Sequence, residues 1–259
     1  MPLPTPSFAH NLNSQFMTTI IKTIGLNKQF VVPHQKRTTL KESFINIFRP
    51  RTFEKFTALK NINLEISKGE FTAIIGPNGS GKSTLLKVLA QIYQPNQGSI
   101  QVNGSIAPLL ELGIGFQGEL TARENIYLNA ALLGFNKKQI HQKFPHIIEF
   151  SEIGNFIDLK VKNFSSGMRA RLAFAIAREL DADIYLCDEV FAVGDQSFQQ
   201  KCLNTFTEWK AQGKNIILVT HNLDFVNKYA DRAIYLANGV MLAEGKPQIV
   251  IQAYQSTPQ

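Results

Sequence analysis

The feature that most constrains the fold of this chain is a glycine-rich loop between an apolar run and a helical pattern. The loop reads Gly76-Pro77-Asn78-Gly79-Ser80-Gly81-Lys82-Ser83-Thr84. The mostly apolar residues 71–75 before it predict a buried strand, and residues 85–90 after it predict a helix. This order, with the spacing G-x4-G-K-[ST], is that of the P-loop, which binds nucleotide triphosphates.

The residue types in this loop suit a bound triphosphate. Glycines allow consecutive backbone N–H groups to curl around a phosphate, and the following helix directs the positive end of its dipole at it. Lys82 adds a charge for the outer phosphates, and Ser83 offers a hydroxyl to Mg2+. The alternative is a plain glycine-rich turn that caps a helix, but the flanking strand and helix favour a nucleotide site.

Composition limits the class of protein. The chain has 259 residues and 44% hydrophobic content, enough for one large domain or two small ones. No run approaches the ~18 apolar residues of a membrane span, and the N-terminus lacks the order of a secretory signal. We therefore expect a cytosolic chain that can attach to a membrane through a partner. Cys187 and Cys202 lack metal-ligand spacing, and the apolar run around Cys187 predicts a small buried side chain.

The net charge of +7 is concentrated near the N-terminus. Residues 1–60 hold nine Lys or Arg and two Asp or Glu, whereas residues 61–259 hold eighteen of each class. A uniformly basic chain would indicate nucleic acid binding. A neutral body with one basic flank fits contact with an anionic surface such as the cytoplasmic leaflet, or a solvated face that keeps the protein soluble. Both interpretations remain open.

The region before the loop divides into several segments. Residues 1–16 have little periodicity and predict a disordered tail. Residues 19–24 predict a strand, and residues 58–66 alternate like a second one. Between them, residues 39–48 predict a short amphipathic helix in a basic insert of about 36–56. Its apolar stripe either packs on its own domain or meets a partner or membrane edge.

The region after the loop predicts alternating strands and helices. Residues 99–102 and 106–112 predict short strands, residues 120–180 have a helical pattern, and residues 233–243 predict a closing hairpin. Within the helical region, Phe164-Ser165-Ser166-Gly167-Met168 precedes a predicted helix. Small and polar residues at a helix start make a second anion site at an N-terminus.

Ionisable side chains follow two apolar runs at the point where each predicted strand ends. Asp188 and Glu189 come directly after residues 184–187, and His221 follows residues 215–220. Ligands bind at the carboxyl ends of strands in open α/β sheets. A carboxylate there holds Mg2+ in P-loop proteins, and a second one can accept a proton from water. Either feature alone could be structural, but beside a P-loop they predict a hydrolytic site.

From about residue 20 to residue 254, these motifs resemble the nucleotide-binding subunit of an ABC transporter. The P-loop matches without departure, Asp188 and Glu189 match the Walker B pair, and His221 matches the switch histidine. Residues 164–168 stand where the family has its LSGGQ signature, and they depart from it at three of five positions.

Three further positions match the family's pattern. Phe30 falls where the family places an aromatic residue that stacks on adenine, although Phe lacks the hydroxyl of Tyr. Gln117 matches the Q-loop glutamine. Asp195 ends residues 192–195, which fill the D-loop position with Ala-Val-Gly-Asp where many members have Ser-Ala-Leu-Asp.

The resemblance implies an α/β fold. We expect a P-loop NTPase, RecA-like core with a mixed sheet, an antiparallel β subdomain and a helical subdomain that carries the signature motif. The helical subdomain would span about residues 118–180, within one ATPase domain of residues 17–259. The exact residues of several segments also resemble those of ATPases that export O-antigen, capsular polysaccharide or teichoic acid. These segments are residues 165–174, the Ala-Val-Gly-Asp loop at 192–195, residues 110–113, residues 123–129 and the long insert between Phe30 and Ala58.

The resemblance also implies a mechanism. Two copies would form a head-to-tail homodimer with two ATP molecules at the interface. Each ATP would contact Phe30 and the P-loop residues 76–84 of one copy and Ser165, Ser166 and Gly167 of the other, because one P-loop contacts only one side of the γ-phosphate. Asp195 would cross the interface.

The resemblance also assigns roles within each site. Ser83, Gln117 and Asp188 would arrange Mg2+. Glu189 would polarise the attacking water, and His221 would contact the γ-phosphate.

The implied partner is an integral membrane permease that moves a lipid-linked polysaccharide, and nucleic acid is not expected as a partner. The chain would then lie peripherally on the cytoplasmic face of the inner (plasma) membrane. The main alternative is a soluble ABC-type ATPase acting on nucleic acid or ribosomes, but such proteins usually carry two cassettes or a long coiled coil. A GTPase would need N-K-x-D, and residues 27–30 lack the aspartate.

Overall fold

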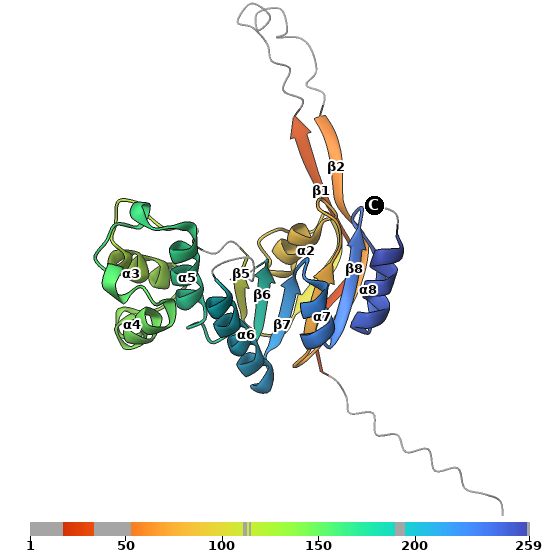
Figure 1. Ribbon diagram of the computed structural model, residues 1–259. Helices are drawn as coiled ribbons and strands as arrows, with labels where there is room; N and C mark the ends of the chain where they lie inside the picture. Colours follow the sequence, from red (N-terminus) through yellow and green to blue (C-terminus); the bar gives the residue numbers. More distant parts are fainter. Residues whose placement is uncertain (1–17, 34–52, 111–112, 114, 190–194, 258–259) are drawn as a thin grey trace, which may run out of the picture.

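Two β-sheets with one helix between them form the centre of the fold (Figure 1). The computed structural model of the chain describes residues 18–33, 53–110, 113, 115–189 and 195–257. The predicted tail and the predicted amphipathic helix at 39–48 lie outside these residues, as do residues 192–194 of the D-loop. The ends of β1 and β2 extend beyond the rest of the molecule in Figure 1.

The smaller sheet is antiparallel and has the strand order β2-β1-β4. Its strands are β1 (Thr19–Pro33), β2 (Phe53–Ser67) and β4 (Gln97–Val102). The sequence predicted the first strand to end at residue 24 and the second to begin at residue 58. Both run further because they pair with each other to the tip, with Val31 opposite Lys55, and the glycine at position 25 is absorbed by a shift in register.

The larger sheet has six strands in the order β5-β6-β7-β3-β8-β9. Neighbouring strands are parallel from β5 to β8, and β9 pairs antiparallel with β8. This confirms the predicted mixed sheet and its closing hairpin. The strands are β3 (Phe71–Ile75), β5 (Ile106–Leu109), β6 (Ile184–Asp188), β7 (Asn215–Val219), β8 (Arg232–Ala237) and β9 (Val240–Gly245).

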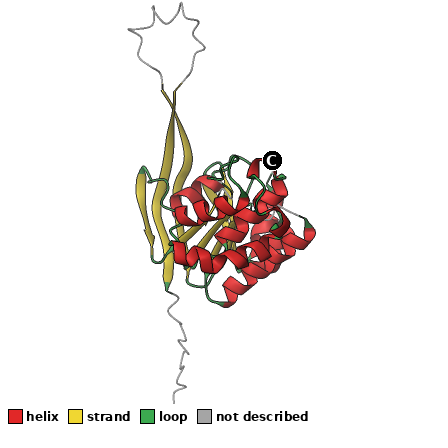
Figure 2. Ribbon diagram, turned by 90° about the vertical axis from the view of Figure 1, so that its left-hand side faces the viewer, coloured by secondary structure: helices red, strands yellow, loops and turns green. Residues whose placement is uncertain are grey.

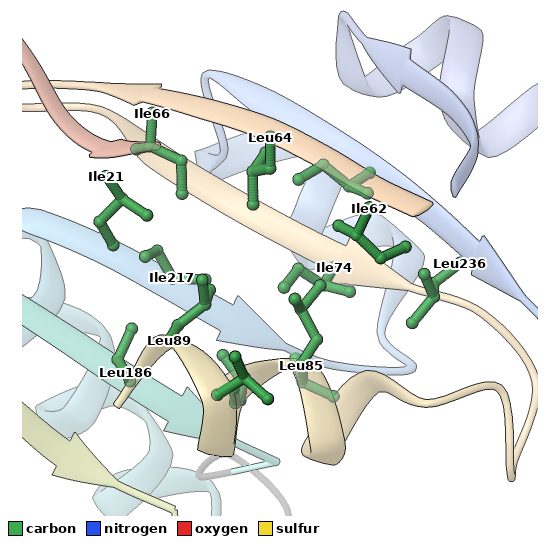
Figure 3. Close-up of a cluster of buried hydrophobic side chains, with 14 of the residues drawn as sticks. Ile21, Ile62, Leu64, Ile66, Ile74, Leu85, Leu89, Leu186, Ile217 and Leu236 are labelled. Atoms are coloured by element: carbon green, nitrogen blue, oxygen red, sulfur yellow. The ribbon is translucent and has the colours of Figure 1, made fainter. Parts of the chain in front are cut away.

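Helix α2 (Lys82–Leu89) fills the space between the two sheets. Figure 3 shows Leu85 and Leu89 of α2 among aliphatic side chains from both sheets, including Leu64 of β2 and Ile217 of β7. All four side chains are buried. Burying each is worth about 1.5–3 kcal/mol, so this core fixes the helix that follows the glycine-rich loop.

An aromatic core covers the other face of the large sheet. Helices α5 (Ser166–Ala177) and α6 (Gln196–Ala211) contribute to it, and Tyr185 of β6 stacks on Trp209 with ring centroids 3.7 Å apart. Cys187 and Cys202 are buried in the same core, which confirms the prediction for Cys187. Burial raises the pKa of the Cys187 thiol well above its ordinary value and that of Cys202 to about 12. Helices α7 (Leu223–Tyr229) and α8 (Pro247–Ser256) cover the β8 side.

The helices between residues 120 and 180 gather at one side of the molecule with a core of their own (Figure 1). Figure 2 views the molecule from that side. They are α3 (Ala122–Leu132), α4 (Lys137–Ser151), α5 and the short turns η1 (Gly154–Phe156) and η2 (Val161–Asn163). Capping boxes at Thr121–Glu124 and Asn136–Gln139 start α3 and α4. Within the described ranges, no helix combines the length and apolar character needed to cross a membrane.

Candidate active site

The glycine-rich loop joins the buried strand β3 to α2, as the sequence predicted. Two of its glycines have positive φ and no room for a side chain. A Cβ on Gly76 (φ 150°) would lie 2.0 Å from the carbonyl oxygen of Leu236, and one on Gly81 (φ 105°) would lie 2.6 Å from that of Ala58. The loop therefore packs directly against the backbone of β8 and β2, which fixes its shape.

We expect Gly76→Ala to destabilise the fold by about 1–3 kcal/mol, since an overpacked backbone contact must be relieved. Gly79→Ala is the matched control, because Gly79 also has a positive φ of 75° but nothing within 4 Å of an added Cβ. That variant should cost only the backbone term of about 1 kcal/mol. Urea unfolding followed by the fluorescence of Trp209 measures both, and equal losses would contradict the packing argument.

Lys82 belongs to the glycine-rich loop and begins α2, and its side chain is buried within the loop. Its residue is 6% exposed, and its ammonium donates hydrogen bonds to the carbonyl oxygens of Gly76 at 2.8 Å and Pro77 at 2.9 Å. Burial lowers the pKa of Lys82, while the nearby carboxylates of Glu189 and Asp188 oppose that shift. The ammonium is therefore held at the centre of the loop, facing the two predicted acidic residues.

Ser83 and Asp188 meet at the base of this loop. Asp188 ends β6, and the Ser83 side chain lies beside its carboxylate. Burial raises the pKa of Asp188, whereas the nearby Ser83 hydroxyl acts in the opposite direction. A hydroxyl and a carboxylate side by side are two oxygen ligands of the kind that Mg2+ prefers.

Glu189 and His221 form the second predicted pair at this edge of the sheet. The imidazole Nε2 of His221 lies 2.9 Å from Oε1 of Glu189, and both side chains are roughly half exposed. They meet because β6 and β7 are parallel neighbours and end at the same edge. Glu189 has φ 50°, a left-handed conformation uncommon for a residue with a side chain, and its N–H donates to the carbonyl of Val219 at 3.0 Å.

The donors around the loop fit a phosphate. Among the described residues, the hydroxyl oxygen of Ser80 is buried without a hydrogen-bond partner, and buried polar atoms normally have one. The N-terminus of α2 has no side-chain cap, and its first turn has no acidic residue. Unsatisfied donors, a helix N-terminus and an ammonium together are the chemistry that binds an anion.

A cation at the site would depend on the phosphate as well as on the protein. In the part of the chain that the structure describes, no three His, Cys, Asp or Glu side chains form a metal-binding group. Ser83 and Asp188 fit a cation that completes its coordination with phosphate oxygens and water, as Mg2+ does. Gln117, predicted as a further ligand, is exposed and hydrogen-bonded through its backbone to Asn125. In the described ranges it makes no hydrogen bond with Ser83 or Asp188.

The predicted signature residues lie on a separate surface. Ser165 is the N-cap of α5, and its hydroxyl accepts a hydrogen bond from the N–H of Met168 at 3.1 Å. Ser165, Ser166 and Gly167 line an open cavity of about 720 Å3 together with Asp195. No residue of the glycine-rich loop is among those described as lining it. The glycine-rich loop and the predicted signature residues therefore lie on two separate surfaces of one chain.

Sequence reasoning missed the ion pairs that hold the second surface together. The guanidinium of Arg171 lies 2.6 Å from Glu152 and 2.5 Å from Asp195, and Lys201 also contacts Glu152. These bonds join α4, α5 and the start of α6. Arg171 lies two turns after Ser165 in a segment that the sequence already singled out, but its partners are distant in the chain and local patterns did not reveal them.

Phe30 lies near the tip of β1 beside Tyr93, which sequence reasoning also missed. The two rings meet edge to face with centroids 5.5 Å apart, and the ammonium of Lys28 lies 5.3 Å and 5.2 Å from them. Phe30 is partly exposed, as a residue that stacks on a base must be.

Residues 59–192 match the protein family described as ABC transporter. The chain is 40% identical over 245 residues to an O-antigen export system ATP-binding protein, RfbB, of Klebsiella pneumoniae. The aligned region covers 92% of this chain and 98% of that protein. It is also 40% identical over 234 residues to a teichoic acids export ATP-binding protein, TagH, of Shouchella clausii. That aligned region covers 89% of this chain and 64% of that protein.

Two solved structures of ATP-binding cassettes share this fold. One is a dimeric, post-hydrolysis cassette bound to ADP and Pi, with a TM-score of 0.71 and 23% identity over 88% of this chain and 98% of the other. Another is an ATP-binding subunit of an ABC transporter, also with a TM-score of 0.71 and 23% identity, covering 92% and 94% of the two chains. These likenesses agree with the mixed sheet, the antiparallel sheet and the separate group of helices.

Proposed function

The chain belongs to the ABC transporter family as an ATP-hydrolysing subunit, and we propose that it drives export of a lipid-linked surface polysaccharide through a separate membrane permease. The observation that carries the substrate class is the identity to an O-antigen export protein over nearly that protein's whole length. The teichoic acid relatives share the same broad class of cargo. These relatives favour export over the alternative of an ATPase acting on nucleic acid or ribosomes.

In this proposal, the loop of residues 76–84 holds the triphosphate of ATP and Phe30 stacks on its base. Lys82 and the N–H groups at the start of α2 supply positive charge to the phosphates, and Ser80 gains a partner for its buried hydroxyl. Ser83, Asp188 and Gln117 would hold Mg2+ in this proposal, and the ion would supply further charge that stabilises the phosphates while the bond to ADP breaks.

Glu189 is the residue that we assign to the attacking water. Its carboxylate lies at the end of β6 next to Asp188 and is half exposed, so water can reach it. The imidazole of His221, whose Nε2 lies 2.9 Å from Oε1 of Glu189, restrains that carboxylate. In this proposal His221 also contacts the γ-phosphate of the bound ATP. Orienting and partly deprotonating the water is a general-base role.

A second copy of the chain completes each site in this proposal. Ser165, Ser166 and Gly167 line a cavity away from their own P-loop, at the start of a helix whose N–H groups suit an anion. If two copies meet head to tail, this surface can meet the γ-phosphate held by the other copy, and Asp195 lies at the rim where the copies touch. ATP then joins the two chains, and its hydrolysis releases them.

The dimer would act from the cytoplasmic face of the inner (plasma) membrane as a peripheral subunit. Opening and closing of the dimer would be passed to the permease, so that each cycle of ATP hydrolysis moves the lipid-linked glycan. The excess of basic residues in positions 1–60 supports a contact with an anionic membrane surface.

Co-purification and reconstitution test the proposal. The tagged chain should bring down an integral membrane protein from detergent extracts, whereas rRNA in its place would favour the alternative function. In proteoliposomes, the complex should hydrolyse ATP faster with the lipid-linked polysaccharide than with the same lipid carrier without its glycan. Equal rates with both lipids would contradict the assigned cargo.

A further inference from the structure

Asn125 is a buried polar residue in the first turns of α3. Its side chain is fully shielded from solvent, although amides are seldom found so deep without a specific partner. It belongs to residues 123–129, which the sequence singled out for their resemblance to polysaccharide exporters. Its contacts show what the buried amide does.

The amide of Asn125 binds both backbone groups of Gln117. Its Oδ1 accepts the N–H of Gln117 at 2.7 Å, and its Nδ2 donates to the carbonyl oxygen of the same residue at 3.0 Å. The same nitrogen lies 3.2 Å from the carbonyl oxygen of Leu120 and 2.9 Å from that of Thr121. One side chain therefore fixes the backbone of Gln117 and closes the loop that joins it to α3.

This loop is also tied to the segment that leads into the signature residues. The N–H groups of Lys162 and Val161 donate to the carbonyl oxygens of Gly118 and Leu120, each at 3.0 Å. A β-bridge pairs Thr121 with residue 160. Gly118 and Ser166 both line a cavity of about 480 Å3. The hydrogen bonds of the Asn125 amide thus lie where the Gln117 loop and the start of α5 meet.

We propose that Asn125 is a positioning residue that holds Gln117 at the distance and angle needed for the cation and phosphate site. Helix capping does not explain its burial, because the capping box of Thr121 and Glu124 already starts α3. Instead, the Asn125 amide pairs with the backbone N–H and carbonyl of the exposed residue Gln117, as a neighbouring strand would. The inference rests on the proposed function, in which Gln117 serves the Mg2+–ATP site.

Asn125→Asp is the sharpest variant, because it keeps the size and the acceptor but removes the donors. The carboxylate would face the carbonyl oxygens of Gln117, Leu120 and Thr121, so the loop should move away from it. We expect hydrolysis by the complex with its permease to fall on the order of 10- to 100-fold. The Mg2+ concentration for half-maximal rate should rise, while Mg2+-free ATP binding stays within about twofold because the P-loop is held by other contacts.

Asn129→Ala is the matched control, since Asn129 is also buried and lies one turn along the same helix. Its amide donates to the backbone carbonyl of Asn125 at 3.1 Å and makes no hydrogen bond to the Gln117 loop in the described residues. It should leave the Mg2+ dependence unchanged. If Asn125→Asp does not fold, Asn125→Ala removes the amide without adding a charge and serves for the same measurements.

A double-mutant cycle with Gln117→Ala decides whether Asn125 acts through Gln117. If it does, adding Asn125→Asp to Gln117→Ala should lower hydrolysis by less than about threefold, because effects that share one pathway do not add. Additive losses, an unchanged Mg2+ dependence or a Gln117→Ala variant with wild-type hydrolysis would each overturn the inference. Wild-type protein without ATP hydrolysis would instead overturn the proposed function, and this inference with it.

Discussion

Glu189→Gln is expected to lower the rate of ATP hydrolysis by about 100- to 10,000-fold, the range of a lost general base. The amide keeps the size of the carboxylate and can adopt the same backbone conformation, but it cannot accept a proton from water. Binding of ATP depends on the P-loop and should persist, so the variant should accumulate as an ATP-bound dimer. Phosphate release and size-exclusion chromatography with ATP measure the two effects.

Glu149→Gln makes the same chemical change at an exposed position of α4 and is the control for a general effect of lost charge. It should hydrolyse ATP at the wild-type rate and remain monomeric after turnover. Hydrolysis by Glu189→Gln within about tenfold of wild type would exclude Glu189 as the general base. The nearby imidazole of His221 would then be the first candidate for that role.

The parts of the fold that the sequence predicted are those with local causes. The P-loop follows from nine consecutive residues, and strands β6 and β7 follow from short apolar runs that end in polar residues. Because parallel neighbours end at the same edge, the meeting of Glu189 and His221 could be expected before any coordinates. The sequence predicted a side chain's position where the order of strands and helices was enough to place it.

Other features depend on pairing between distant segments and could not be predicted in this way. The strand β1 continues past Gly25 to Pro33 because β2 pairs with it, whereas the apolar pattern predicted a strand only over residues 19–24. The left-handed conformation of Glu189 likewise has no local signal, since residues other than glycine seldom adopt it.

Side chains that act across elements were the hardest to foresee. Asn125 and Arg171 both lie in segments that the sequence analysis singled out, but the sequence did not predict which groups their side chains contact. Asn125 is eight residues from Gln117, and Arg171 is 24 residues from Asp195. Helical spacing rules cover only three or four residues, so these contacts needed the tertiary structure.

Ser165→Arg is expected to prevent the ATP-dependent dimer when it is combined with Glu189→Gln, which would otherwise trap it. A long side chain would fill the space at the start of α5 where the γ-phosphate of the other copy must approach. Its positive charge is unfavourable beside the positive end of the helix but would attract the γ-phosphate, so the expected block comes from the bulk of the side chain. Blocking a central contact should cost about 2 kcal/mol or more, roughly a 30-fold weaker dimer.

Loss of the helix cap is a competing explanation, because the Ser165 hydroxyl accepts the N–H of Met168. Ser165→Ala loses the same cap, worth about 0.5–2 kcal/mol, without added bulk. Ser165→Asp keeps a cap but places a negative charge against the incoming phosphate. If the shared-site interpretation is correct, the Asp variant should fold at least as stably as the Ala variant yet dimerise less. A Ser165→Arg protein that still dimerises with ATP would show that α5 does not meet the nucleotide of the other copy, and the P-loop would then have to be completed by its own chain.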